Sequence, residues 1–147
     1  MTRKARLIAG GCHTDERGKI CFINDFDMTL IKRFYLIKPS NSTIFRDWRA
    51  HKIEQRWFYV IKGSFEIKLI KIDNWESPNP SLPQEIFIIS ADENLVLHVP
   101  KGFGSSIKAC EENSNLMVFA DSSINQAEND NYFFSSNYFK TNSNFHK

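Results

Sequence analysis

Titratable side chains are most concentrated in the segment Arg46-Asp-Trp-Arg-Ala-His-Lys-Ile-Glu-Gln-Arg-Trp57. Side chains alternate across a strand, so Arg49 and His51 share one face, and Arg46 has the opposite parity unless the strand is bulged. The pKa of histidine, ~6.5, suits a general base near neutral pH. Arginine keeps its charge and donates in a fork, so this segment favours chemistry on an anion.

Each of these residues also has a structural interpretation. A lone histidine on a strand often packs in a core with its ring nitrogens satisfied, and Tyr35 on a preceding strand is equally typical of a packing aromatic. Arg46 and Arg49 fit surface cations paired with Asp47 or Glu54. The sequence leaves both interpretations open.

The elements around this segment read as strands. Period-two patterning covers residues 29–38 and 56–73, the second range broken by a turn at Gly63. Residues 74–83 contain three prolines and are expected to leave the sheet as a loop. Further short strands are expected at residues 85–90, 95–99, 105–109 and 115–121, and Asp15-Glu-Arg-Gly18 reads as a hairpin turn. The pattern predicts an all-β sandwich or barrel.

Composition narrows the class further. The 147 residues suit one domain, 1–147, with a core at about residues 20–121 and a C-terminal extension, 122–147, rich in Asn, Ser and aromatics. The extension carries Tyr132, Phe133, Phe134, Tyr138, Phe139 and Phe145, which we expect to pack on the open end of the barrel or on a partner subunit.

Net charge is +2, but residues 1–62 hold 13 Lys/Arg against 6 Asp/Glu, and residues 63–147 hold 6 against 11. The cations form no basic block, so an ordinary solvated distribution or a cation-lined anion cavity is favoured over nucleic-acid binding. No apolar run is long enough to span a membrane. Cys12, Cys21 and Cys110 are odd in number and far apart in sequence, which suggests neither a disulfide framework nor a thiolate metal site and fits the cytoplasm.

Aligned on Gly63, and on Pro100 with Gly102, the sequence resembles the two motifs of the cupins, which implies a double-stranded β-helix, the cupin jelly-roll barrel. The positions of the family's metal ligands hold Arg49, His51, Arg56 and Ser105. Only one of these four ligates metals readily, and catalytic metals usually need three protein ligands. We therefore expect a barrel with no metal and no organic cofactor.

Among metal-free cupins, two sugar-nucleotide families are similar. The 3,4-ketoisomerases of dTDP-4-keto-6-deoxyhexoses carry R-G-x-H-A-H-K, which Arg46-Asp-Trp-Arg-Ala-His-Lys52 resembles, with Arg49 in place of the first histidine. The 3,5-epimerases of dTDP-4-keto-6-deoxyglucose carry D-x-R-x-x-S-P and P-x-G-F, which Asp73-Asn-Trp-Glu-Ser-Pro78 and Pro100-Lys-Gly-Phe103 resemble. Ser105 stands near that family's histidine, and Phe119 near its catalytic tyrosine.

These resemblances imply a nucleotide-sugar isomerase or epimerase that removes a proton beside a keto group. His51 is then the candidate base, Arg49 or Arg56 holds the enolate oxygen, and Arg46 clamps the diphosphate. Tyr35 donates a proton or orients the sugar, so the catalytic set is His51, Arg49 and Tyr35 and the binding set is Arg46 and Arg56.

His98 is expected to face away from the cavity. A homodimer is expected, because exposed strand edges need covering. The alternative is a non-catalytic carbohydrate- or nucleotide-sugar-binding cupin.

Overall fold

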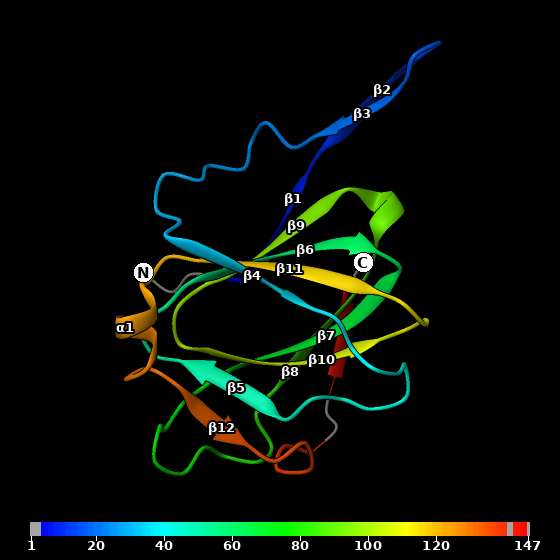
Figure 1. The fold of residues 1–147 in the computed structure, drawn as a ribbon. Coiled ribbons are helices and arrows are strands. Elements are labelled where there is room, and N and C mark those ends of the chain that lie inside the picture. Colours follow the sequence, from blue (N-terminus) through cyan, green and yellow to red (C-terminus); the bar gives the residue numbers. More distant parts are fainter. Residues whose placement is uncertain (1–3, 141–142, 147) are drawn as a thin grey trace.

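Two β-sheets packed face to face make up most of the molecule (Figure 1). The computed structural model describes residues 4–140 and 143–146, the last four as backbone alone. The first sheet has the order β1 (Arg6–Ala9), β9 (Leu95–Val99), β6 (Arg56–Lys62), β11 (Asn115–Ala120), β4 (Arg33–Ile37). The second has the order β12 (Tyr132–Phe134), β5 (Trp48–His51), β10 (Phe103–Ala109), β7 (Ser64–Lys71), β8 (Gln84–Ser90), β13 (Ser143–His146). The all-β, two-sheet barrel predicted from the sequence is confirmed.

The core lies between the two sheets and follows from alternation along the strands. Phe65, Ile67 and Leu69 of β7 point inward and are almost fully buried, together with apolar residues of β6, β9, β10 and β11. Gly63 joins β6 to β7 with a φ of 77°, and a Cβ atom there would lie 2.0 Å from Ser114 Oγ. A residue with a side chain would therefore be both strained and crowded at this turn.

Most predicted strands are present with small shifts at their ends. The exception is residues 29–38, because β4 begins only at Arg33. Before it, the Asp27 carboxylate accepts hydrogen bonds from the backbone N and the hydroxyl of Thr29, and Ile31 N donates to Met28 O. This local side-chain turn competes with the sheet and delays the strand. Residues 74–83 contain no strand, as predicted.

The C-terminal extension packs on the outer face of the second sheet, not on the open end of the barrel. Trp48, Ile70 and Ile72 point outward there and are covered by Phe139, with Tyr132, Phe134 and Tyr138 packed beside them. The open end of the barrel was therefore the wrong target for these aromatics, because the outward side chains of β5 and β7 are themselves apolar, and packing on a partner subunit stays a prediction. Phe133 is the exception and reaches the candidate site. The side chain of Phe145 lies outside the described residues.

Three further elements lie beside the sheets. They are a short 3-10 helix, η1 (Ala91–Glu93), a single helical turn, α1 (Ile124–Ala127), and a hairpin of β2 (Gly11–Asp15) and β3 (Gly18–Phe22). The two-residue turn of that hairpin falls between Asp15 and Gly18, as the sequence indicated. None of the helices in the described part of the chain has the length and apolar character needed to cross a membrane.

Candidate functional site

A cavity of about 590 Å³ opens between the sheets. Four of the five sequence-predicted site residues line it, namely Tyr35, Arg46, Arg49 and Arg56. Lys38, Asp47, Phe58, Ser105, Val118 and Phe133 are also among the lining residues. The walls therefore carry four cationic side chains and one carboxylate, so the cavity is strongly electropositive and suits an anionic ligand.

Arg56 is the most buried of these cations, with 3% of its surface exposed. Its Nη1 donates to Ser105 Oγ at 3.0 Å, and its guanidinium lies 5.3 Å from the ring centre of Phe58. Its Nε and Nη2 have no hydrogen-bond partner among the described residues. Burial lowers the pKa of Arg56 below its usual value, while Tyr35 and Glu54 act in the opposite direction. Unpaired N–H donors of a buried cation are costly and call for an acceptor.

Arg49 and Arg46 lie closer to solvent at the cavity mouth. Arg49 is exposed, and its guanidinium lies over the ring of Phe133 at 5.0 Å. Arg46 also lines the cavity despite its opposite parity, because β5 begins only at Trp48 and the alternation does not extend back to residue 46. Its backbone N donates to Ile107 O at 3.0 Å and its carbonyl accepts from Ser106 Oγ at 2.7 Å. These bonds fix the segment beside β10.

Tyr35 reaches the cavity from β4, directly across the ladder from Val118 of β11. Phe119, which the sequence placed near the family's catalytic tyrosine, faces the opposite way. It packs on the outer face of the first sheet, where the ring centres of Phe119 and Phe26 lie 5.3 Å apart. Phe119 therefore does not line the cavity, and Val118 holds the inward position on that strand.

His51 shares the inward face of β5 with Arg49 but does not line the cavity, and only 3% of it is exposed. Its Nδ1 lies 2.7 Å from the carbonyl oxygen of Asp130. A carbonyl only accepts, so Nδ1 carries the proton and Nε2 of the neutral ring is an acceptor. Nε2 lies 3.5 Å from Glu54 Oε2. Burial, and then the charge of Arg56, lower the pKa of His51 to about 3.

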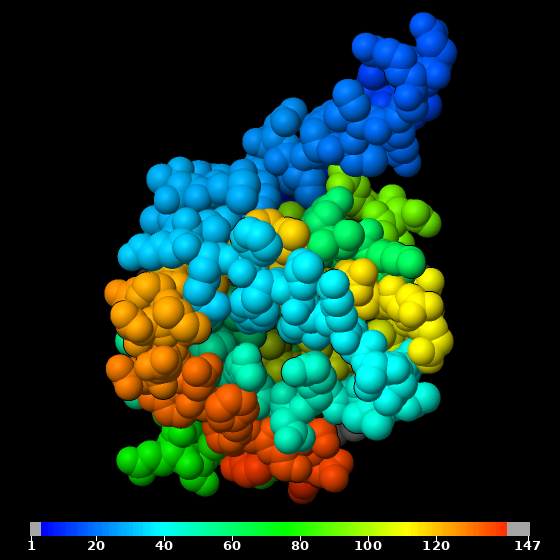
Figure 2. Space-filling view, in the orientation of Figure 1, coloured from blue at the N-terminus to red at the C-terminus, as the bar shows by residue number. Residues whose placement is uncertain are grey.

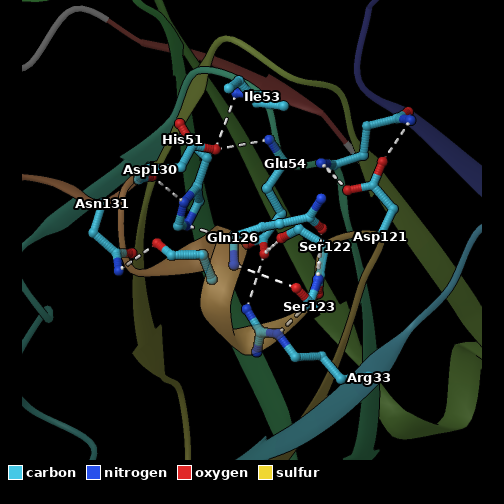
Figure 3. Close-up of polar contacts among 12 residues, drawn as sticks. Arg33, His51, Ile53, Glu54, Asp121, Ser122, Ser123, Gln126, Asp130 and Asn131 are labelled. Atoms are coloured by element: carbon cyan, nitrogen blue, oxygen red, sulfur yellow. Dashed lines mark hydrogen bonds and ion pairs between the residues drawn. The ribbon is translucent and has the colours of Figure 1, made fainter.

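A network of hydrogen bonds and one ion pair holds His51 in place (Figure 3). The Asp130 carboxylate accepts from the backbone N of Lys52, Ile53 and Glu54 at 2.8 to 3.0 Å. Glu54 Oε1 accepts from Arg33 Nη2 at 2.9 Å and from the hydroxyl of Ser122. The turn between β5 and β6 is thereby tied to both β4 and the C-terminal extension.

Sequence reasoning missed this network and part of the cavity wall. No local signal connects Asp130 to His51, since they are 79 residues apart. Lys38 and Phe133 were visible only as a strand-end cation and a tail aromatic. His98 was predicted to face away from the cavity, and it does. It lies on the outer face of the first sheet, stacked on Trp57 at 5.0 Å, and it is buried there rather than exposed.

Within residues 4–140, no three of these side chains come together in a group suited to a metal ion. Beside the cavity, His51 and Glu54 are accompanied by the guanidinium groups of Arg49 and Arg56. Arginine stays protonated and does not ligate, so the donor set does not fit a catalytic metal.

A family model described as FdtA, WxcM-like, C-terminal, matches residues 3–144. The chain belongs to this family. This chain is also similar in part to a choline-phosphate cytidylyltransferase of Haemophilus influenzae. The two are 28% identical over 88 residues, which is 60% of this chain. The match spans 36% of that curated relative, so the two proteins correspond over about a third of its length.

Two solved structures illustrate the fold of this WxcM-like chain. The 3,4-ketoisomerase QdtA of Thermoanaerobacterium thermosaccharolyticum has a TM-score of 0.67 and 23% identity, covering 89% of this chain and 88% of QdtA. The rmlC epimerase of Mycobacterium tuberculosis has a TM-score of 0.70 and 14% identity, covering 88% of this chain and 68% of the epimerase. Both likenesses show the cupin-type barrel predicted from the sequence.

Proposed function

We propose that this WxcM-like protein is an isomerase or epimerase of a nucleotide-linked 4-keto-6-deoxyhexose, with a dTDP sugar as the first candidate. The observation that carries the proposal is the guanidinium of Arg56, which is buried in the cavity with unpartnered Nε and Nη2 donors. These donors suit an oxygen that carries or develops negative charge.

The rest of the cavity fits the same ligand. A volume of about 590 Å³ lies within the range of roughly 300–1,000 Å³ usual for small-molecule sites. Arg46 and Arg49 at the mouth are placed to hold a diphosphate, and Tyr35 and Ser105 offer hydroxyls to the sugar. QdtA was solved as a histidine-to-asparagine mutant in complex with TDP-4-keto-6-deoxyglucose, which supports this substrate class for the present chain.

In the proposed reaction, Nε2 of His51 removes a proton from the carbon beside the keto group. His51 donates its Nδ1 proton to the carbonyl oxygen of Asp130, which leaves the lone pair on Nε2 free. Glu54 Oε2 lies 3.5 Å from Nε2 and stabilises the imidazolium that forms. Arg56 or Arg49 holds the enolate oxygen, and Tyr35 returns a proton. Burial is the main cause of the low pKa of His51, and the charges of Arg56 and Arg49 lower it further, so an anionic substrate that offsets these two charges raises the pKa of His51.

A specific observation favours a second candidate, a non-catalytic nucleotide-sugar-binding protein. His51 is outside the cavity lining, and both its ring nitrogens face protein groups. A histidine placed in this way supports the barrel without reaching a ligand. The two candidates share the binding role of Arg56 and differ in whether the substrate reaches His51.

Solvent deuterium exchange separates the two candidates. The protein is incubated in D₂O with dTDP-4-keto-6-deoxyglucose, and NMR follows the protons flanking the keto group, with binding measured in parallel. We expect exchange with the wild type and a loss of about 10²- to 10⁴-fold with His51→Asn, whose nucleotide binding stays intact. His98→Asn, another buried histidine, is the matched control and keeps its rate. Equal background rates with intact binding favour the non-catalytic candidate, and absence of binding to any nucleotide sugar contradicts both.

We also propose that the protein works as a homodimer in which β4 meets a second copy of itself. This strand is at the edge of the first sheet, and its outward residues Phe34 and Leu36 are 61% and 42% exposed. An unpaired edge with apolar side chains is self-complementary across a two-fold axis. Sedimentation at micromolar concentration is expected to give a dimer for the wild type and a monomer for Phe34→Glu. A monomeric wild type contradicts the proposal.

A further inference from the structure

A second hollow, the outer cavity, lies on the outer face of the second sheet and has a volume of about 620 Å³. Alternation along the strands turns the residues of its floor away from the barrel interior. The floor holds Trp48 of β5, Ser106 of β10, Lys68 of β7 and Gln84 of β8. Arg49 and Ser105, one position away on β5 and β10, line the first cavity, so the two cavities are on opposite faces of this sheet.

The rim of the outer cavity is formed by the segment before β5 and by the end of the C-terminal extension. The end of the extension, orange-red in Figure 2, lies against the blue-green residues that lead into β5. In this contact the backbone N of Ser136 donates to Asp47 Oδ1 at 2.9 Å, and nearby the backbone N of Lys140 donates to Pro80 O at 2.8 Å. These bonds fix the rim, and the volume lies within the range of roughly 300–1,000 Å³ usual for small-molecule sites.

Gln84 is the most informative residue of the floor because its side-chain amide is buried and only half paired. It is 2% exposed, and its Nε2 donates to the carbonyl oxygen of Lys140 at 2.7 Å. Only the nitrogen of the amide can donate to a carbonyl, so this bond fixes the orientation of the amide. The Oε1 atom has no hydrogen-bond partner among the described residues. A buried acceptor without a donor is costly, and a hydroxyl group of a ligand would supply the donor.

Lys68 gives the outer cavity a positive charge. It is half-buried, and its ammonium group lies 3.9 Å from the ring centre of Phe45. Within residues 4–140 it forms no ion pair with a carboxylate. Lys140 is a second cation of the lining, and no Asp or Glu is among the described residues that line this cavity. The outer cavity is therefore electropositive and favours an anion.

The aromatic side chains of the outer cavity are already covered. Trp48 and Phe139 are 2% and 6% exposed and pack edge to face, with ring centres 5.1 Å apart. Lys68 lies over the ring of Phe45. These rings leave little free surface for stacking a flat base, whereas the exposed hydroxyl and amide side chains of the rim can bond hydroxyl groups. The lining thus suits a hydroxyl-rich anion better than a nucleobase.

We propose that the outer cavity is a second binding site, which takes a phosphorylated sugar. Lys68, with Lys140 at the rim, holds the phosphate group, and Gln84 Oε1 accepts a hydrogen bond from a hydroxyl group of the sugar. Both cavities can be occupied together because the second sheet separates them. The inference therefore does not depend on the proposed function.

An NMR titration of the full-length protein with glucose 1-phosphate tests the proposal. We expect shifts at the side-chain amide of Gln84 and at the backbone amides of Ser136 and Asn137. The signals of Tyr35 and Arg56, on the first sheet, report separately on the first cavity. Because the charge and the hydroxyl groups both contribute, inorganic phosphate and methyl glucoside are each expected to bind at least about tenfold more weakly.

Lys68→Met removes the charge and keeps the packing of the aliphatic stem, so it is expected to weaken the binding of glucose 1-phosphate about tenfold. Lys71 is exposed at the end of the same strand and does not line the outer cavity, so Lys71→Met is the matched control and keeps the wild-type affinity. Gln84→Leu removes the buried acceptor and is expected to lower the affinity about fivefold. Thermal unfolding without ligand shows that each variant is folded.

Three results would overturn the proposal. The first is that glucose 1-phosphate shifts only the signals of the first cavity, or none. The second is that inorganic phosphate binds as tightly as glucose 1-phosphate. The third is that folded Lys68→Met keeps the wild-type affinity.

Discussion

Two groups of buried charged side chains lie on either side of the turn between β5 and β6, and they differ in how well their polar atoms are paired. Around Asp130 and Glu54, the carboxylates accept from three backbone N–H groups, Arg33 and Ser122. Around Arg56, one donor meets Ser105 and two donors have no partner within the described residues. In the first group only Glu54 Oε2 and the facing Nε2 of His51 have no hydrogen-bond partner in the described part of the chain, whereas the cation of the second group has the incomplete pairing expected where a ligand binds.

This difference leads to opposite expectations for mutation. Removing a well-paired member of the first group, such as Asp130, leaves buried donors unpaired and destabilises the fold. Removing Arg56 takes away a buried cation that is poorly paired, which costs little stability and abolishes a contact with the ligand. The predictions below test that contrast, beginning with the largest effect.

Asp130→Ala is expected to give the largest loss of stability, about 3 kcal/mol, because three buried or half-buried backbone N–H groups lose their acceptor. The same change loosens the loop that orients His51. The free energy of unfolding is measured by urea denaturation. Glu128→Ala, an exposed carboxylate two residues earlier, is the control and is expected to change stability by less than about 0.5 kcal/mol. Equal stabilities of the two variants would show that the network does not support the fold.

The stability of the wild type is expected to fall with pH below about 6.5 because of His51. Its pKa is lowered from 6.5 to about 3 in the folded protein, so between these values the unfolded chain binds a proton that the folded chain does not. Stability is thus fully present above pH 6.5 and is lost as pH falls, by roughly 2 kcal/mol between pH 6.5 and 5.

Urea denaturation at several pH values, together with NMR of the His51 ring, measures this effect. We expect a neutral ring with the proton on Nδ1 at pH 5, and a flatter pH dependence in His51→Gln. A His51 ring already charged at pH 6 would contradict the burial of this side chain beside Arg56.

Arg46→Ala is expected to weaken nucleotide-sugar binding by about tenfold, since a diphosphate clamp at the mouth acts on ground and transition states alike. In an active enzyme this appears as a higher KM with little change in kcat. Lys62→Ala removes an exposed cation that does not line the cavity and serves as the control. A lowered kcat at constant KM would assign Arg46 to the chemical step instead.

Phe133→Ala is expected to have the smallest effect, about a threefold loss of affinity. The ring lies 5.0 Å from the guanidinium of Arg49 and limits its orientations, a contact worth about 0.5–1 kcal/mol at an exposed site. Phe22→Ala, an exposed aromatic of the projecting hairpin, is the control. Unchanged affinity in Phe133→Ala would remove the C-terminal extension from the binding site.

The sequence predicted most of the fold because period-two patterning is a local property. The strands flanking Gly63 and the proline-containing excursion at residues 74–83 follow from it directly. The shortened β4 was missed because the Asp27 side chain forms a local turn that hydrophobic patterning does not report.

The site was predictable in its cations and less so in its arrangement. Side chains alternate between the two faces only inside a strand. Alternation therefore predicted the inward face for Arg49 correctly and failed for Arg46, which precedes β5. The pairing of Cys12 with Cys21 depends on hairpin register, and the contact of Asp130 with His51 on the route of the C-terminal extension. Both are set by tertiary structure rather than by spacing along the chain.

The most direct test of the central claim is a calorimetric titration of dTDP and dTDP-4-keto-6-deoxyglucose into wild type and Arg56→Met, with urea denaturation of both proteins without ligand. The account predicts that Arg56→Met is as stable as the wild type within about 1 kcal/mol and binds the nucleotide sugar about 100-fold more weakly. A variant that unfolds like Asp130→Ala, or that binds the nucleotide sugar as tightly as the wild type, would contradict it.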